Sequence, residues 1–220
     1  MRTIRVTGKG QIKVRPDMTR ITLSLEGFHK EYGETLRRSS EDTEKLKTLL
    51  GGYGFAAEDL KTLYFSVDTE YESYKEKDVY KSRFVGYRYH HNMKVEFASD
   101  NERLGRILYG LAASPVKPEF HFSFFVGDPE DAKNELLGRA VADSREKAEV
   151  LTKAAGVCLK EVQSIDYSWG EIDLEVRPMN RMLMAEESAS FKARGESFDM
   201  NIEPDDIEVS DTVTVVWEIE

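Results

Sequence analysis

Cysteine and histidine are scarce in this sequence. Cys158 is the single cysteine of the 220 residues, so an intramolecular disulfide is excluded. Its place shortly after Gly156 predicts that it packs as a small hydrophobic side chain, with a reactive thiol as the alternative. There are four histidines, and His90 and His91 are neighbours on an expected strand, so their side chains should lie on opposite faces. With no HxH, HExxH or paired-cysteine spacing, neither a metal ion nor a cofactor is expected.

Long apolar runs are also missing. A helix that crosses a bilayer needs roughly 20 consecutive apolar residues, and no stretch approaches that length. The N-terminal sequence MRTIRVTGKG has no hydrophobic segment of the signal-peptide type. We therefore expect no membrane insertion and a cytoplasmic location for the chain as given, with prior removal of a leader left open.

Recognisable catalytic motifs are absent as well. The sequence has no GxSxG nucleophile elbow and no phosphate-binding loop. Gly8-Lys9-Gly10 is not followed by a helix pattern, so it indicates a bulge or a close backbone approach within a strand. Arg88, Arg103 and Arg139 could bind an anion, but positions on solvated faces explain them equally well. No catalytic residue is predicted.

Acidic residues are abundant. The chain has 31 basic and 41 acidic residues and a formal net charge of −10. A field of this sign repels phosphate backbones and anionic lipid surfaces, so we expect no nucleic-acid partner. Solubility alone accounts for such acidity.

Alternation of apolar and polar residues predicts most of the strands. Strands are expected at residues 3–15, 21–25, 63–71, 85–97, 120–126, 162–169 and 209–219. The turn Arg15-Pro16-Asp17 predicts that the first two form an antiparallel hairpin. Residues 72–84 (ESYKEKDVYKSRF) are charged and rich in tyrosine, which predicts an exposed hairpin tip, with a contact surface as the alternative.

Three helices are expected, and the longest, over residues 128–156, organises the rest. Asp128 and Pro129 suit its start, and Gly156 suits its end. A narrow stripe of small and apolar side chains predicts close packing on a sheet; it comprises Ala132, Leu136, Leu137, Ala140, Val141, Ser144, Ala148, Leu151 and Ala155. A helix over about 31–50 should face inward through Tyr32, Leu36, Thr43, Leu46 and Leu50. A shorter helix should begin at the capping-box pattern of residues 99–102.

The order of these elements predicts an α+β fold. We expect a mainly antiparallel sheet covered on one side by helices, in the order ββαββαβαββ with a long excursion before the last strand. Residues 1–220 should form one domain, in one or two lobes.

Residues 170–207, the excursion, are polar and irregular. Loops of this length are usually functional or disordered. Methionines on such a segment can form an adaptable contact surface, and an excursion that packs on its own subunit is the alternative. Together with the aromatic strand near residue 120, this predicts an interaction surface made of Met179, Met182, Met184, Phe120, Phe122 and Phe124.

Five stretches, in this order, resemble the SIMPL-domain family, a domain of unknown function. They are IRVTGKGQIKVRPDMTRITLSLEG, EDLKTLYFSVDTEY, VGYR, AVADSREKAEVLTKAAGV and IEVSDTVTVVWEI. The resemblance implies bacterial relatives in the periplasm or envelope that are associated with oxidative-stress defence, at least one of which forms a large ring- or channel-like oligomer. It also implies an animal relative named for binding a signalling kinase. It implies no catalytic residues.

Three functions compete. The preferred hypothesis is a non-enzymatic module for protein–protein interaction, assembling as a homo-oligomer or binding another protein. The second is a small-molecule-binding protein or a hydrolase with a cleft between helices and sheet. The third is a redox role for Cys158.

Overall fold

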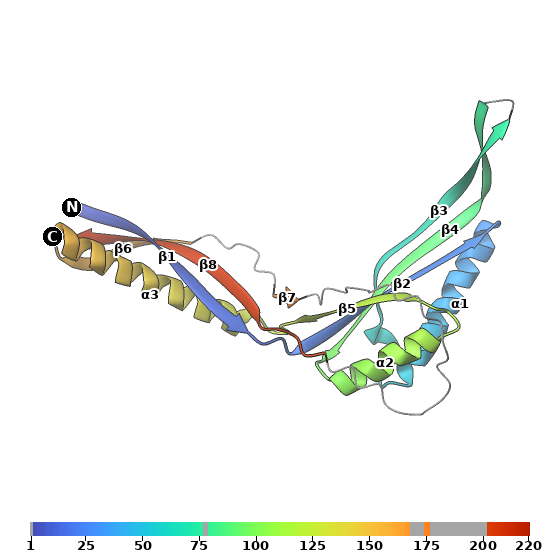
Figure 1. The fold of residues 1–220 in the computed structure, drawn as a ribbon, viewed down its shortest axis with the longest axis horizontal. Coiled ribbons are helices and arrows are strands. Elements are labelled where there is room, and N and C mark those ends of the chain that lie inside the picture. The colour runs from blue at the N-terminus through green and yellow to red at the C-terminus, as the bar shows by residue number, and fades with distance from the viewer. Residues whose placement is uncertain (1, 77–78, 168–173, 177–201) are drawn as a thin grey trace, which may run out of the picture. The chain divides into compact units, whose positions relative to one another are not determined.

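The computed structural model describes residues 2–76, 79–167, 174–176 and 202–220. Its chain divides into two compact units. Unit 1 consists of Met1–Asp17, Phe125–Val176 and Pro204–Glu220, and unit 2 consists of Met18–Phe124 and Arg177–Glu203. Figure 1 labels the elements of both units, which are described separately below.

Unit 1 is a three-stranded antiparallel sheet covered by one long helix. Its strands are β1 (Arg2–Val14), β8 (Ile207–Ile219) and β6 (Leu159–Asp166), in the order β1-β8-β6. β1 and β8 pair along their whole length, from Arg2↔Ile219 to Val14↔Ile207. Helix α3 (Glu130–Ala155) lies along β1 and β8 (Figure 1), and the unit also includes the two-residue strand β7 (Glu175–Val176), which is not part of this three-stranded sheet. The expected long helix on strands from both ends of the chain is confirmed.

The C-terminal end of α3 follows the expected chemistry, whereas the helix begins one residue later than expected, with Pro129 in the N-cap position. The Asp128 carboxylate accepts a hydrogen bond of 3.1 Å from the Glu130 amide at the start. Gly156 has φ 70° and ψ 29°, a left-handed conformation that glycine adopts without strain. Its amide donates to the Lys153 carbonyl, which closes the helix.

The buried stripe of α3 differs from the predicted one at its C-terminal end. The buried positions advance by four residues, through Leu136, Ala140, Ser144, Ala148 and Thr152. Leu151, 49% exposed, and Ala155 were wrongly predicted to lie in the stripe. A step of four residues turns the stripe slowly around a 3.6-residue helix, so it reaches Thr152 and leaves Leu151 in solvent.

The two glycines of β1 let α3 approach the sheet closely. A Cβ atom at Gly8 would collide with the Ala140 carbonyl oxygen, and one at Gly10 with the Leu136 carbonyl oxygen. The predicted close backbone approach at Gly8-Lys9-Gly10 is therefore confirmed. Ser144 adds a hydrogen bond of 3.3 Å from its hydroxyl to the Val6 carbonyl.

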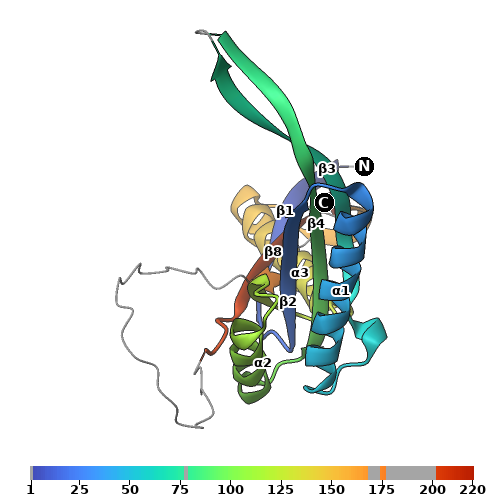
Figure 2. The same cartoon turned by 90° about the vertical axis from the view of Figure 1, so that its right-hand side faces the viewer.

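Unit 2 is a second antiparallel sheet with helices on one face. Its strands are β2 (Met18–His29), β3 (Lys61–Glu76), β4 (Val79–Ala98) and β5 (Glu119–Phe125), in the order β3-β4-β2-β5. Helices α1 (Tyr32–Gly51) and α2 (Asn101–Ala113) cover one face (Figure 2), and a short 3-10 turn η1 (Ala57–Asp59) leads into β3. The α+β class and the expected element order are confirmed, with the strands distributed over two sheets.

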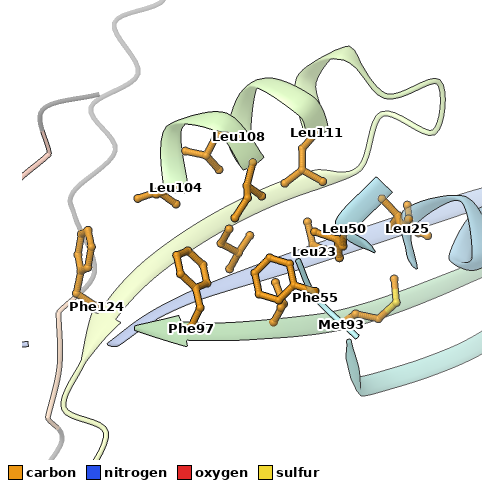
Figure 3. Close-up of a cluster of buried hydrophobic side chains, with 14 of the residues drawn as sticks. Leu23, Leu25, Leu50, Phe55, Met93, Phe97, Leu104, Leu108, Leu111 and Phe124 are labelled. Atoms are coloured by element: carbon orange, nitrogen blue, oxygen red, sulfur yellow. The ribbon is translucent and has the colours of Figure 1, made fainter. Parts of the chain in front are cut away.

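The core of unit 2 lies between this sheet and α1 and α2. Leucines of α2 point toward side chains of β2 and β4 in Figure 3, and Phe55 packs edge-on against Phe97 at 5.6 Å. The fully or nearly fully buried side chains include Ile21, Leu23, Leu46, Leu50, Met93, Val95, Leu104, Ile107, Leu111 and Phe124. The alternation predicted for β2 and β4 therefore places the correct residues inside.

The predicted hairpin between the first two strands is wrong. Val14 at the end of β1 pairs with Ile207, whereas Met18 at the start of β2 pairs with Ala98. Asp17 binds the end of β5 and the segment after it instead: its amide donates to the Phe125 carbonyl at 3.2 Å, and its carboxylate accepts from the Gly127 amide at 2.8 Å. Alternation shows which face of a strand is buried but does not identify the neighbouring strand.

The inner face of α1 also differs from the prediction. Thr35 and Ser39 are buried at its N-terminal half, whereas Tyr32 and Leu36 are exposed. Small side chains let this half lie close to the sheet, an advantage that apolar periodicity does not reveal. At the start of α2, Asp100 is the capping residue and accepts a 3.0 Å hydrogen bond from the Arg103 amide, one residue later than the predicted pattern.

Candidate functional site

The predicted interaction surface is described only in its aromatic half. Phe124, 1% exposed, belongs to the core of unit 2, and Phe120 and Phe122 are half-buried against that core. Met179, Met182 and Met184 lie outside the described residues. The role of these six residues in contacts stays a prediction.

The face of the unit 2 sheet opposite α1 and α2 carries a row of paired charges. Arg20 on β2 and Lys94 on β4 both bind the Glu96 carboxylate, at 2.6 and 2.8 Å. Burial alone would raise the pKa of Glu96, but the hydrogen bonds from Lys94 and Arg20 bring it below its ordinary value. This carboxylate is therefore held ionised as a structural partner and is poorly suited to general-acid chemistry.

A polar hollow of about 300 Å³ lies farther along the same face. His90 Nδ1 lies 3.7 Å from Glu26 in it, and the Ser24 hydroxyl donates to the Asn92 side chain. Its polar lining comes from Ser24, Glu26, Tyr64, His90, Asn92 and Glu119. These groups can bind a small polar molecule, but Ser24 is engaged by Asn92 and not by a base, so the arrangement lacks an activated nucleophile.

A larger hollow of about 610 Å³ lies on the outer side of α1. Ser40, Glu44 and Thr48 line it from the helix, and Ser114 and Pro115 line it from the segment after α2. It is an open surface depression, not the cleft between helices and sheet that the second hypothesis requires.

The three candidate anion-binding arginines have partners within the chain. Arg88 binds Glu70, and that hydrogen bond raises the pKa of Arg88. Arg103 donates to the Tyr53 carbonyl at 3.1 Å and lies 4.3 Å from the centre of the Phe55 ring. Arg139 binds Glu135 at 2.7 Å. These contacts favour structural roles for all three.

The two neighbouring histidines occupy opposite faces, as predicted. His91 is buried under α1, where Thr43 contacts its Nδ1 at 3.1 Å and Thr62 its Nε2 at 2.9 Å. Burial lowers the pKa of His91, and the positive charge of Lys47 lowers it further. The described part of the chain contains no group of three or more His, Cys, Asp or Glu side chains that could hold a metal ion.

Cys158 is exposed, so the prediction that it packs as a small hydrophobic side chain is wrong. Its amide and carbonyl pair with Glu220 at 2.6 and 3.0 Å, which holds the backbone at the edge of unit 1 while the thiol faces solvent. Two backbone hydrogen bonds determine its position without burying its side chain.

Residues 72–76 and 79–84 belong to β3 and β4 and are exposed, so the expected exposure is found but the expected irregular loop is not. β3 and β4 pair from Glu70↔Gly86 to Glu76↔Val79, beyond the last pair of β2 with β4, His29↔Tyr87. We call this two-stranded ribbon, Glu70–Glu76 with Val79–Gly86, the arm. The high charge concealed a period-two pattern in which Tyr71, Ser73 and Lys75 share one side.

No helix within the described ranges combines the length and the apolar character required to cross a membrane.

The comparisons with known proteins agree on one family. The family model of SIMPL, described as a protein of unknown function (DUF541), matches residues 4–217. The chain is 28% identical over 163 residues to the 26 kDa periplasmic immunogenic proteins of Brucella melitensis and Brucella abortus. The aligned stretch covers 74% of this chain and 65% of each relative, so the chain spans less than two thirds of their length. Because the family model covers nearly every residue of both units, the chain belongs to the SIMPL family.

Proposed function

We propose that this protein is a non-enzymatic interaction module that associates with copies of itself. The observation that carries the proposal is β3, a 16-residue strand at the edge of the unit 2 sheet. Its outer edge has no partner strand among the residues described, and Leu63, Tyr64 and Phe65 near its start are exposed. Open edges and exposed apolar side chains promote association between chains.

Light scattering on the full chain tests this function. A mass above 25.2 kDa that rises with protein concentration supports self-association. A second measurement on a chain that lacks residues 176–200 tests whether the excursion contributes. A single mass of one chain for both proteins, at every concentration up to the millimolar range, would remove the proposal.

A small-molecule-binding protein is the second candidate. It is supported by the hollow lined by Glu26, His90 and Glu119, where charged and polar groups converge on one space. Thermal unfolding in the presence of small amines, carboxylates and sugars tests it. A stabilising compound whose effect disappears in His90→Gln supports binding at this site, and no stabilisation by any compound argues against it.

The compartment and the physiological role are separate parts of the proposal. The two candidate compartments are the cytoplasm, which was the expectation above, and the periplasm, for which the relatives are named. Cell fractionation with an antibody against the chain distinguishes the two locations. The role in stress defence rests on the family resemblance, and survival of a deletion strain in peroxide tests it.

A further inference from the structure

The arm extends past the rest of unit 2. In Figure 1 and Figure 2, β3 and β4 continue as a two-stranded ribbon beyond the end of β2 and beyond α1. The ribbon leaves the rest of the sheet at Gly86, where the pairing of β3 with β4 shifts its register by one residue between Glu70 and Tyr71. Gly86 has φ 155°, and a Cβ there would lie 2.5 Å from the His29 carbonyl oxygen, so glycine allows β4 to pass the end of β2.

One side of the arm carries charges that are already paired. Arg83 binds Glu72 at 2.7 Å, and Lys81 binds Glu76 at 2.6 Å. The guanidinium of Arg83 also lies 5.9 Å from the centre of the Tyr74 ring. This side is a hydrated surface with its ion pairs formed within the ribbon.

The other side is aromatic. The cross-strand pairs Tyr71↔Phe84, Ser73↔Ser82 and Lys75↔Tyr80 define it. Tyr71 and Phe84 meet edge-on with ring centres 5.9 Å apart, and Phe84 meets Tyr87 at 5.1 Å. An aromatic cluster of Tyr71, Phe84 and Tyr87 therefore extends from the sheet onto the arm, and Tyr80 lies farther along the same side beyond Ser82.

These aromatic side chains are uncovered. Tyr71 is 58% exposed, Phe84 46% and Tyr80 77%. A two-stranded ribbon is at best marginally stable in water without packing on one of its faces. Tyrosine and phenylalanine are also enriched in the buried centres of protein interfaces. The aromatic side of the arm therefore has the properties of a surface that is covered by a partner.

We propose that this aromatic side packs against the same side of the arm of a second copy of the chain. The inference rests on the self-association proposed above and assigns it a surface. Charge favours a second copy as the occupant: residues 70–86 contain four acidic and four basic residues and are neutral, whereas the chain carries −10. Two acidic chains that meet through neutral arms avoid placing like charges against one another. Contact between identical surfaces is the arrangement of a two-fold dimer.

The first test compares two sets of substitutions on the arm of the full chain by sedimentation equilibrium. Tyr71→Ser with Phe84→Ser removes the aromatic side, and Tyr74→Ser is the matched control on the charged side of the same strand. We expect the double variant to raise the dissociation constant by about 100-fold and the control by less than about threefold. Equal association of wild type and double variant would overturn this surface and leave self-association standing, whereas a monomeric wild type would refute the proposed function itself.

The second test does not depend on the stability of the double variant. In a Cys158→Ser background, Ser82→Cys places a thiol on the aromatic side and Lys81→Cys places one on the charged side. A short bismaleimide should cross-link two Ser82→Cys chains at least about tenfold faster than two Lys81→Cys chains. Equal rates would overturn the proposal. The proposal would also be overturned if the full chain formed no dimer and instead sedimented with neutral phosphatidylcholine vesicles through its arm, because a lipid surface would then cover the aromatic side.

Discussion

The indole nitrogen of Trp217 on β8 donates a hydrogen bond of 3.2 Å to the hydroxyl of Ser144 on α3. The same hydroxyl donates to the Val6 carbonyl on β1, so one buried oxygen joins the helix to two strands. Ser144 is fully buried and Trp217 nearly so. Within unit 1, the Ser144 hydroxyl therefore helps to hold α3 on the sheet through two hydrogen bonds.

Replacement of Ser144 by alanine should destabilise unit 1. The indole N–H of Trp217 would remain buried without its acceptor, which costs about 1–3 kcal/mol. Urea unfolding followed by tryptophan fluorescence measures the loss. Ser164→Ala on the exposed strand β6 is the control and should change the unfolding free energy by less than about 0.5 kcal/mol. Equal effects of the two substitutions would contradict a structural role for the Ser144 hydroxyl.

Alanine at Gly8 or Gly10 should separate α3 from β1. Each new methyl group would meet a backbone carbonyl of α3, which cannot rotate away. We expect a loss of about 1–3 kcal/mol or more in the unfolding free energy for each substitution. Gly138→Ala is a matched control, because Gly138 lies within α3 and a Cβ there would meet nothing within 4 Å. That control should stabilise the helix by roughly 0.5–1 kcal/mol, and a destabilised control would argue against this account.

Unit 2 should lose stability as the pH falls below about 6.5. Burial, followed by the charge of Lys47, lowers the pKa of His91 below its value in the unfolded chain. Between the pKa of His91 in the folded chain and its pKa in the unfolded chain, the unfolded state binds more protons than the folded state. The stability that the neutral His91 contributes is therefore complete above the unfolded pKa, and below it falls by at most about 1.4 kcal/mol per pH unit. Unfolding measured from pH 8 to pH 5 should be less pH-dependent in His91→Asn than in wild type. Identical profiles for wild type and His91→Asn would exclude His91 as the cause.

Glu34 should remain ionised far into the acid range. Hydrogen bonds from Arg37 and Arg38, at 2.7 and 2.9 Å, lower its pKa from 4.5 to about 2. The stability that the ionised Glu34 carboxylate gives to α1 is thus present above pH 4.5 and is lost as the pH falls toward 2. Carboxyl NMR titration should show this midpoint, and Arg37→Gln with Arg38→Gln should return it toward 4.5. A high-salt titration of wild type should show part of the same return, because Glu34 is on the surface.

Apolar periodicity predicted the strands and helices well, because each element has one face buried against its own unit. Val6, Gly8, Gly10 and Ile12 all face α3 as their common parity requires. Strand partners were less predictable. The pairing of Met18 with Ala98 depends on which strands lie side by side, and neither sequence carries that information.

The arm and the polar hollow were missed for different physical reasons. In the arm, Glu72 and Arg83 neutralise each other across the strands, a relationship visible only once the register is known. In the hollow, Glu26 and His90 come from different strands, and neither residue belongs to a recognised motif. Cross-strand pairs of this kind are not neighbours in the sequence, and even Glu72 and Arg83 are 11 residues apart, so local patterns do not indicate them.

The pairing of β1 with β8 has a consequence for biosynthesis. β8 is the central strand of unit 1, and its residues 207–219 leave the ribosome almost 200 residues after those of β1. Throughout that interval the nascent chain carries β1 with its hydrogen-bonding edge unsatisfied, whereas residues 18–124 of unit 2 emerge as one continuous stretch. During translation, β1 must therefore wait for its partner β8, and chaperones that shield open edges should act on β1.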